Sequence, residues 1–137
     1  MAKTERWGNI DCNVNTCALT GAAAFFGGIP KAEIIANGPL WCYFYALRYL
    51  EKADPKIERR FQGTQPDNTA VVYGTEDCLL ETLTKLKENS KPSVLLIENS
   101  CSVSLIGDDI AGIARKAALP FPTVCFDSGG LIGGFSE

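Results

Sequence analysis

The stretch SVLLIENSC, residues 93–101, decides the fold class. Its first half is a run of apolar residues without the alternation of a half-exposed strand, which is typical of a strand covered on both faces. Polar residues follow at 98–100, and a helical pattern begins near residue 108 after the turn at Gly107. A buried strand followed by a helix is the repeating unit of a parallel α/β sheet.

The same order of strand and helix recurs on both sides of this stretch. We expect strands at 33–37, 70–73, 93–97 and 123–126, and helices at 17–26, 40–52, 77–87 and 108–118. Residues 54–68 are polar and are predicted to form a loop. The pattern predicts an α/β fold, a parallel doubly wound (Rossmann-like) sheet of about four strands with flanking helices. We interpret 1–16 as an N-terminal arm and 17–137 as a single domain, truncated from a longer multi-domain protein.

Composition excludes several classes of protein. The chain has 137 residues, enough for one domain with a hydrophobic core, and its 46% hydrophobic and 21% charged residues are near globular averages. The net charge of −3 disfavours nucleic acid as a partner, and no apolar run is long enough to span a membrane. The polar N-terminus lacks a signal sequence, so we expect a cytoplasmic protein. Because disulfides are rare there, its six cysteines need another explanation.

Two cysteines follow predicted strands. The chain has no histidine, so no imidazole can serve as a metal ligand or base beside them. Cys42 comes after the strand at 33–37 and Cys101 after the strand at 93–97, so both should lie at the ligand-binding edge of the sheet. Cys17 precedes a segment of small residues able to pack close by. A thiol at a helix N-terminus has a lowered pKa, and a thiolate is a metal ligand. Cys78 and Cys125 fit the simpler role of small buried hydrophobes.

Three segments together resemble a known family. They are TCALTGA at 16–22, NGPLWC at 37–42 and NSCSVSLIGDDI at 99–110. In this order they are similar to the N-terminal domain of the nitrogenase component 1 superfamily. That superfamily includes the molybdenum–iron protein subunits, the cofactor-assembly scaffold, dark-operative protochlorophyllide reductase and the reductase of coenzyme F430 synthesis. The similarity extends over roughly residues 12–137.

The resemblance implies a cofactor and partners. Cys17, Cys42 and Cys101 would hold an iron–sulfur cluster at a subunit interface, either [4Fe–4S] or a larger eight-iron, P-cluster-like centre. We expect their sulfurs within about 7 Å of one another. Three thiolates leave a cubane one ligand short, which implies a homodimer or a heterodimer with a related subunit. In the family an ATP-dependent iron protein supplies the electrons, and further domains supply the substrate-reducing site, so no catalytic residue is assigned to this chain.

Three other interpretations stay open at this point. The same cysteines would serve a cluster or cofactor assembly scaffold without turnover of its own. They would also serve a structural metal domain with cysteine ligands only. Finally, a flavodoxin-like binding domain would simply bury its thiols. Whether Cys12 or an acid such as Asp11 adds a ligand to the site also stays open.

Overall fold

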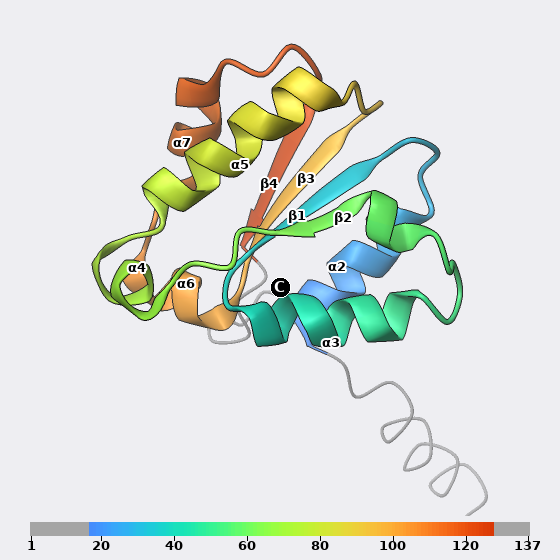
Figure 1. Cartoon of the computed structure of the whole chain (residues 1–137), viewed down its shortest axis with the longest axis horizontal. Helices are drawn as coiled ribbons and strands as arrows, with labels where there is room; N and C mark the ends of the chain where they lie inside the picture. The colour runs from blue at the N-terminus through green and yellow to red at the C-terminus, as the bar shows by residue number, and fades with distance from the viewer. Residues whose placement is uncertain (1–16, 128–137) are drawn as a thin grey trace, which may run out of the picture.

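A four-stranded parallel sheet forms the centre of the domain in the computed structural model, which describes residues 17–127 (Figure 1). The strands are β1 (Glu33–Asn37), β2 (Phe61–Gly63), β3 (Leu95–Asn99) and β4 (Thr123–Asp127), in the order β2-β1-β3-β4. The two longest pairings place β3 between β1 and β4, in register from Glu33 opposite Leu95 to Asn37 opposite Asn99. All five residues of β3 are buried, so the strand predicted at 93–97 begins and ends two residues later and also buries Glu98 and Asn99.

Helices cover both faces of the sheet (Figure 1). One face carries α2 (Ala18–Gly27) and α3 (Leu40–Leu50), and the other carries α5 (Glu76–Asn89) and α7 (Ile110–Ala117). Short helices α4 (Asn68–Tyr73) and α6 (Cys101–Ile106) contact each other, and a 3-10 turn, η1 (Ile57–Arg59), precedes β2. The predicted α/β fold with flanking helices is therefore confirmed.

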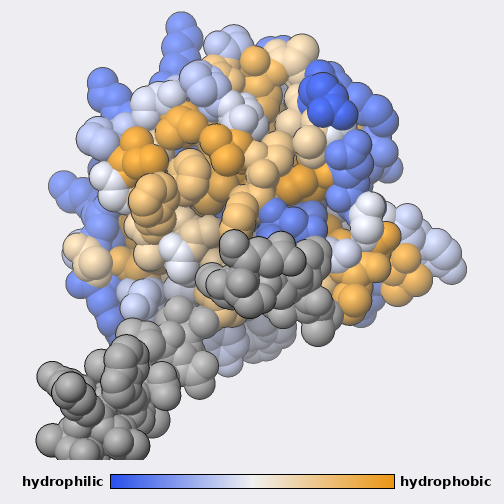
Figure 2. All heavy atoms as spheres, turned by 180° about the vertical axis from the view of Figure 1, so that it is seen from behind, coloured by the Kyte–Doolittle hydropathy of each residue, from blue (hydrophilic) through white to orange (hydrophobic). Residues whose placement is uncertain are grey.

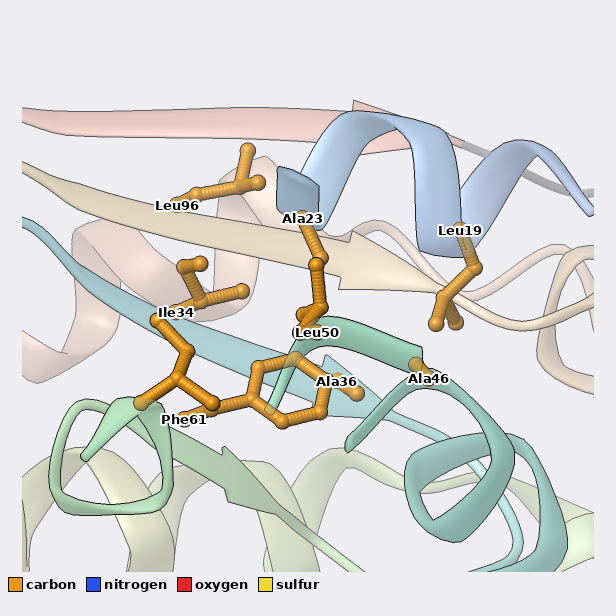
Figure 3. Close-up of a cluster of buried hydrophobic side chains, with 9 residues drawn as sticks. Leu19, Ala23, Ile34, Ala36, Ala46, Leu50, Phe61 and Leu96 are labelled. Atoms are coloured by element: carbon orange, nitrogen blue, oxygen red, sulfur yellow. The ribbon is translucent and has the colours of Figure 1, made fainter. Parts of the chain in front are cut away.

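Alternation along β3 gives the two faces separate cores. Leu96 packs with Ile34 of β1 and with Leu19 and Ala23 of α2 (Figure 3). Its neighbours Leu95 and Ile97 pack instead against α5 and α7. Because successive side chains of a strand point to opposite faces, Glu98 shares the α2 face with Leu96, and Asn99 shares the α5 face with Ile97.

The strand predicted at 70–73 is wrong: these residues belong to α4. The Oδ1 atom of Asp67 accepts a hydrogen bond from the amide of Ala70, which starts a helix, and Gly74 ends it with a φ of 132°. Val72 and Tyr73 are 68% and 85% exposed, so the apolar character of this segment does not reflect burial within this domain.

The fourth strand lies instead at Phe61–Gly63, inside the predicted loop 54–68. Its buried Phe61 stacks on Tyr43 of α3, with ring centroids 5.0 Å apart, and its backbone pairs with β1. Three residues are too few to show a periodic pattern, which explains the error. Helix α6 was also not predicted. None of the helices within 17–127 is both long and apolar enough to cross a bilayer.

Candidate metal centre

Cys42 and Cys101 lie at the carboxyl end of the sheet, as predicted. Cys42 is in the first turn of α3, five residues after the end of β1, and Cys101 is the first residue of α6, directly after β3 and Ser100. Strands β1 and β3 are hydrogen-bonded neighbours, so the two loops leave the sheet side by side. Figure 1 shows α6 beside the start of α3.

Cys17 reaches the same region from α2. It is the N-cap residue of this helix, in an extended backbone conformation, and its side chain accepts no capping hydrogen bond from the helix. Its sulfur is 3.5 Å from the hydroxyl of Thr20. Because α2 packs on α3, β1 and β3, its first residue lies near the ends of both strands. An uncapped helix N-terminus with no acidic residue in its first turn favours a negatively charged group.

The three thiols interact electrostatically. Burial raises the pKa of the Cys42 thiol, and the negative charges that Cys17 and Cys101 bear as thiolates raise this pKa further. A hydrogen bond from the Ser100 side chain acts in the opposite direction, because it stabilises the Cys42 thiolate. Cys17 and Cys101 are exposed, whereas Cys42 is half-buried. Two of the thiols thus remain accessible beside a third that is partly enclosed.

The spacing of the acids and thiols bears on the kind of metal that would fit. Within residues 17–127, no three such side chains come close enough together to hold a single ion. Ligands of one tetrahedral ion with bonds of about 2.3 Å stand only about 4 Å apart, whereas each ligand of a cluster binds its own iron and lies further from the others. Thiols are the donors that iron–sulfur clusters use, so the chemistry of the three cysteines fits such a group. The predicted separation of the sulfurs stays a prediction.

The other cysteines lie elsewhere. Cys125 packs among the apolar side chains of the α5–α7 face, as expected of a small hydrophobe. Cys78 lines a polar cleft between the end of β2 and helices α4 and α5, together with Asp77 and Glu81. Cys12 and Asp11, the possible extra ligands, fall outside the described residues.

A buried hydrogen-bond network holds the strand ends in place. Asn37, the last residue of β1, donates from Nδ2 to Asn99 Oδ1 at 3.1 Å and to Thr75 Oγ1 at 3.0 Å. Its own Oδ1 accepts from Thr64, 2.9 Å away, just after β2. One side chain thus fixes the ends of β1 and β3 relative to the start of α5. These are the strand ends from which the Cys42 and Cys101 loops depart.

The two loops also touch directly. A Cβ atom built on Gly38 would lie 2.2 Å from Ser100 Oγ and 2.5 Å from Ser100 Cβ. The glycine of the NGPLWC segment is therefore required by the close approach of the Cys101 loop. At Gly21 of the TCALTGA segment, by contrast, nothing lies within 4 Å of a Cβ placed there.

The paired aspartates of the third segment have separate structural tasks. Asp108 Oδ2 accepts from both the amide and the hydroxyl of Thr75, each at 2.7 Å. Asp109 caps α7 by accepting from the amide of Gly112. Gly107 ends α6 in the left-handed conformation, with a φ of 80°. Gly107 thus ends α6, Asp108 binds the residue that precedes α5, and Asp109 begins α7.

Sequence reasoning missed one chemically unusual residue, Glu98. Its side chain is fully buried, and neither of its carboxyl oxygens has a hydrogen-bond partner. Burial, followed by the negative charge of Cys17, raises the pKa of Glu98 to about 9. An acid directly after the apolar run at 93–97, in a strand expected to be covered on both faces, was the available signal.

Comparison with known proteins identifies relatives over most of the chain. The family model described as "Nitrogenase component 1 type Oxidoreductase" matches residues 17–137. A nitrogenase molybdenum-iron protein alpha chain from Methanothermococcus thermolithotrophicus is 30% identical, with 89% of this chain and 29% of that protein aligned. The nitrogenase iron-molybdenum cofactor biosynthesis protein NifE from Methanosarcina barkeri is 27% identical, with 74% of this chain and 22% of that protein aligned.

Solved structures show the same fold. A structure titled "Nitrogenase Cp1 at pH 6.5" superimposes with a TM-score of 0.74 at 16% identity, over 83% of this chain and 26% of that one. The chain spans less than a third of the length of the curated relatives described above. The match over residues 17–137, reinforced by the 30% identity to the alpha chain, shows that this chain belongs to the nitrogenase component 1 type oxidoreductase family.

Proposed function

We propose that this chain is the iron–sulfur cluster-binding, electron-transfer domain of a nitrogenase-like component 1 oxidoreductase, with Cys17, Cys42 and Cys101 as the cluster ligands. The observation that supports this most strongly is that Cys42 and Cys101 follow two hydrogen-bonded neighbouring strands at one edge of the sheet, while Cys17 begins α2, which packs on both strands. These cysteines come from three separate segments of the chain, whereas Cys78 and Cys125 lie away from them.

The chain's own residues would hold the group and control its surroundings. An iron–sulfur cluster supplies one-electron transfer when it is bound. The N-terminus of α2 favours its negative charge, and the Ser100 side chain stabilises the Cys42 thiolate. The network around Asn37 fixes the distance between the two strand-end loops.

A second subunit fits the exposed surface beside Cys42. On α3, Trp41 and Tyr45 are 66% and 67% exposed, and Phe44 is also exposed. Aromatic residues are enriched in protein–protein interfaces, and Figure 2 shows further apolar surface on the face seen from behind. We propose a homodimer or a heterodimer with a related subunit, located in the cytoplasm and reduced by an ATP-dependent iron protein. The curated relatives include both a nitrogenase molybdenum-iron protein alpha chain and, from another organism, a beta chain, which supports a related subunit as the partner.

An assembly scaffold is the second candidate. The cofactor biosynthesis protein NifE is among the relatives, and a scaffold would use the same three thiols. Incubation of the loaded protein with ATP and a cognate iron protein separates the two functions. Electron transfer requires ATP-dependent bleaching of the cluster, whereas a scaffold would instead pass its metal to an apo acceptor protein.

The ligand assignment is tested by anaerobic reconstitution of the whole chain with ferrous iron and sulfide. We expect C17A, C42A and C101A each to lose most of the bound iron and sulfide while retaining the circular dichroism of the wild type. C78A is the matched control and should retain both. Full iron content in C42A and C101A would overturn the proposal.

A further inference from the structure

We propose that the hydroxyl of Thr20 donates a hydrogen bond to the sulfur of Cys17 and thereby raises the reduction potential of the cluster. This inference rests on the proposed function, because it requires Cys17 to bind iron. Thr20 is not a ligand in this proposal. It is a positioning residue that acts on the cluster only through Cys17.

The first turn of α2 brings the two side chains together. Cys17 is the N-cap residue, and Thr20 follows it at the third position of the helix. The Oγ1 atom of Thr20 is 3.5 Å from the Sγ atom of Cys17. In a capping box, the side chain at this third position bonds to the backbone of the N-cap residue. Here the side chain reaches the sulfur of the N-cap residue, which is the atom that would bind iron.

The protein encloses Thr20. The residue is only 4% exposed, and the other buried residues of α2 are the apolar Ala18, Leu19 and Ala23. A buried hydroxyl costs free energy unless it is hydrogen-bonded, and a neutral thiol is a weak partner. A thiolate sulfur is a better acceptor, because hydrogen bonds to charged groups are shorter and stronger. The position of Thr20 therefore suits a metal-bound sulfur better than a free thiol.

Metal binding determines the direction of this hydrogen bond. In the free thiol either atom can be the donor. A sulfur that binds iron has lost its proton, so Thr20 donates and Cys17 accepts. Reduction adds one electron to the cluster and increases the negative charge on its sulfurs. The hydrogen bond therefore stabilises the reduced form more than the oxidised form, and hydrogen bonds to the sulfurs are among the factors that set the potential.

The expected effect does not depend on the partner subunit. Thr20 and Cys17 belong to the same helix turn, so the hydrogen bond forms whether the cluster is completed by a second copy or by a related chain. A second buried hydroxyl acts in the same sense at the site, because the Ser100 side chain hydrogen-bonds to Cys42. Two of the three proposed ligands thus have a hydroxyl donor from their own chain.

The test compares the wild type with T20V, which keeps the shape of the side chain without its hydroxyl, and with T20S, which keeps the hydroxyl. T82V is the matched control. Thr82 is also partly buried in a helix, but its hydroxyl donates to the backbone carbonyl of Cys78 on α5, 2.9 Å away. After anaerobic reconstitution of the whole chain, iron and sulfide are quantified, and a redox titration monitored by EPR gives the midpoint potential.

All four proteins should bind the same amount of iron, because Thr20 is not a ligand. At a fixed potential, T20V should shift the ratio of oxidised to reduced cluster about tenfold toward the oxidised form, which corresponds to a midpoint potential lower by about 59 mV for one electron. T20S and T82V should keep the midpoint potential of the wild type. Recovery in T20S would show that the hydroxyl, rather than the packing of the side chain, causes the shift.

Each outcome bears on one of the two proposals. An unchanged potential in loaded T20V, or an equal shift in T20S or T82V, overturns the role of Thr20 and leaves the proposed function intact. Loss of iron from T20V but not from T20S also overturns it, since Thr20 would then be needed for binding the metal. If T20V does not fold, T20A, which also lacks the hydroxyl, decides in the same way. Failure of the wild type to bind iron, or full binding by C42A and C101A, overturns the proposed function itself.

Discussion

Replacing Glu98 by Gln should change how the stability of the metal-free protein depends on pH. The pKa of Glu98 is about 9 in the folded chain, because burial and the charge of Cys17 disfavour the ionised form. Its ordinary value, which applies to the unfolded chain, is 4.5. Between these values the folded state keeps a proton that the unfolded state has lost. The free energy of unfolding therefore falls as the pH rises.

The magnitude follows from the same pKa difference. A difference of one bound proton changes the free energy of unfolding by about 1.4 kcal/mol per pH unit. Because of Glu98, this free energy should therefore fall by about 3 kcal/mol between pH 6 and pH 8. The stabilising contribution of Glu98 is complete below pH 4.5 and is lost as the pH passes through about 9. A domain of ordinary stability has only about 5–15 kcal/mol to lose. Glutamine has the same shape and no proton to release, so E98Q should lack this loss.

Urea denaturation of wild type and E98Q at pH 6, 7 and 8, with chelator and reductant present, measures the effect. The thiols are common to both proteins, so their ionisation largely cancels in the difference. The two stability curves should diverge by about 3 kcal/mol over this range, with E98Q the more stable at pH 8. Parallel curves would refute the reasoning, since they would mean that Glu98 is ionised in the folded chain or is solvated there.

Three further changes test the loops around the site. D108A removes the acceptor for the amide and the hydroxyl of the buried Thr75. It should lower the free energy of unfolding, measured in urea, by roughly 2–4 kcal/mol. An effect below about 0.5 kcal/mol would contradict the role of this carboxylate. G38A places a methyl group against Ser100. It should lower the free energy of unfolding by about 1–3 kcal/mol in the same assay and reduce iron retention. Unchanged stability and iron content would show that the loops separate freely. In the metal-free protein, Cys42 should react with iodoacetamide more slowly than the exposed thiols at pH 8, because its pKa is raised and its sulfur is half-buried; equal rates by peptide mass spectrometry would oppose this.

Much of the fold follows from hydrophobic patterning alone. The buried strand at 95–99 and the amphipathic helix α5 have patterns long enough to be unambiguous. The segment at 70–73 shows the limit of such patterns. Its Ala-Val-Val-Tyr composition favours a strand, but the Asp67 cap determines its structure locally. The three-residue strand β2 is defined by pairing with β1, an interaction that no local pattern records.

The candidate site also has features that sequence patterns predict and features that they do not. Thiols at the ends of strands were predictable, because parallel strands bring their carboxyl ends to one edge. The hydrogen bonds of Asn37 were not, since their partners lie up to 62 residues away in the sequence. Glu98 was overlooked for a related reason: a lone acid after an apolar run looks like the solvated end of a strand. Only the packing of α2 over it shows that its carboxyl group is buried.

The two faces of β3 carry different kinds of side chain near the site. Asn99 points to the α5 face, where it joins Asn37 and Thr75, whereas Glu98 points to the α2 face beside Cys17. Because the two side chains point to opposite faces of the sheet, substitutions on the two faces should act independently. In the metal-free protein, the effects of E98Q and D108A on the free energy of unfolding should add within about 0.5 kcal/mol. A coupling above about 1 kcal/mol in this double-mutant cycle would mean that the end of β3 shifts when the network on the α5 face is broken.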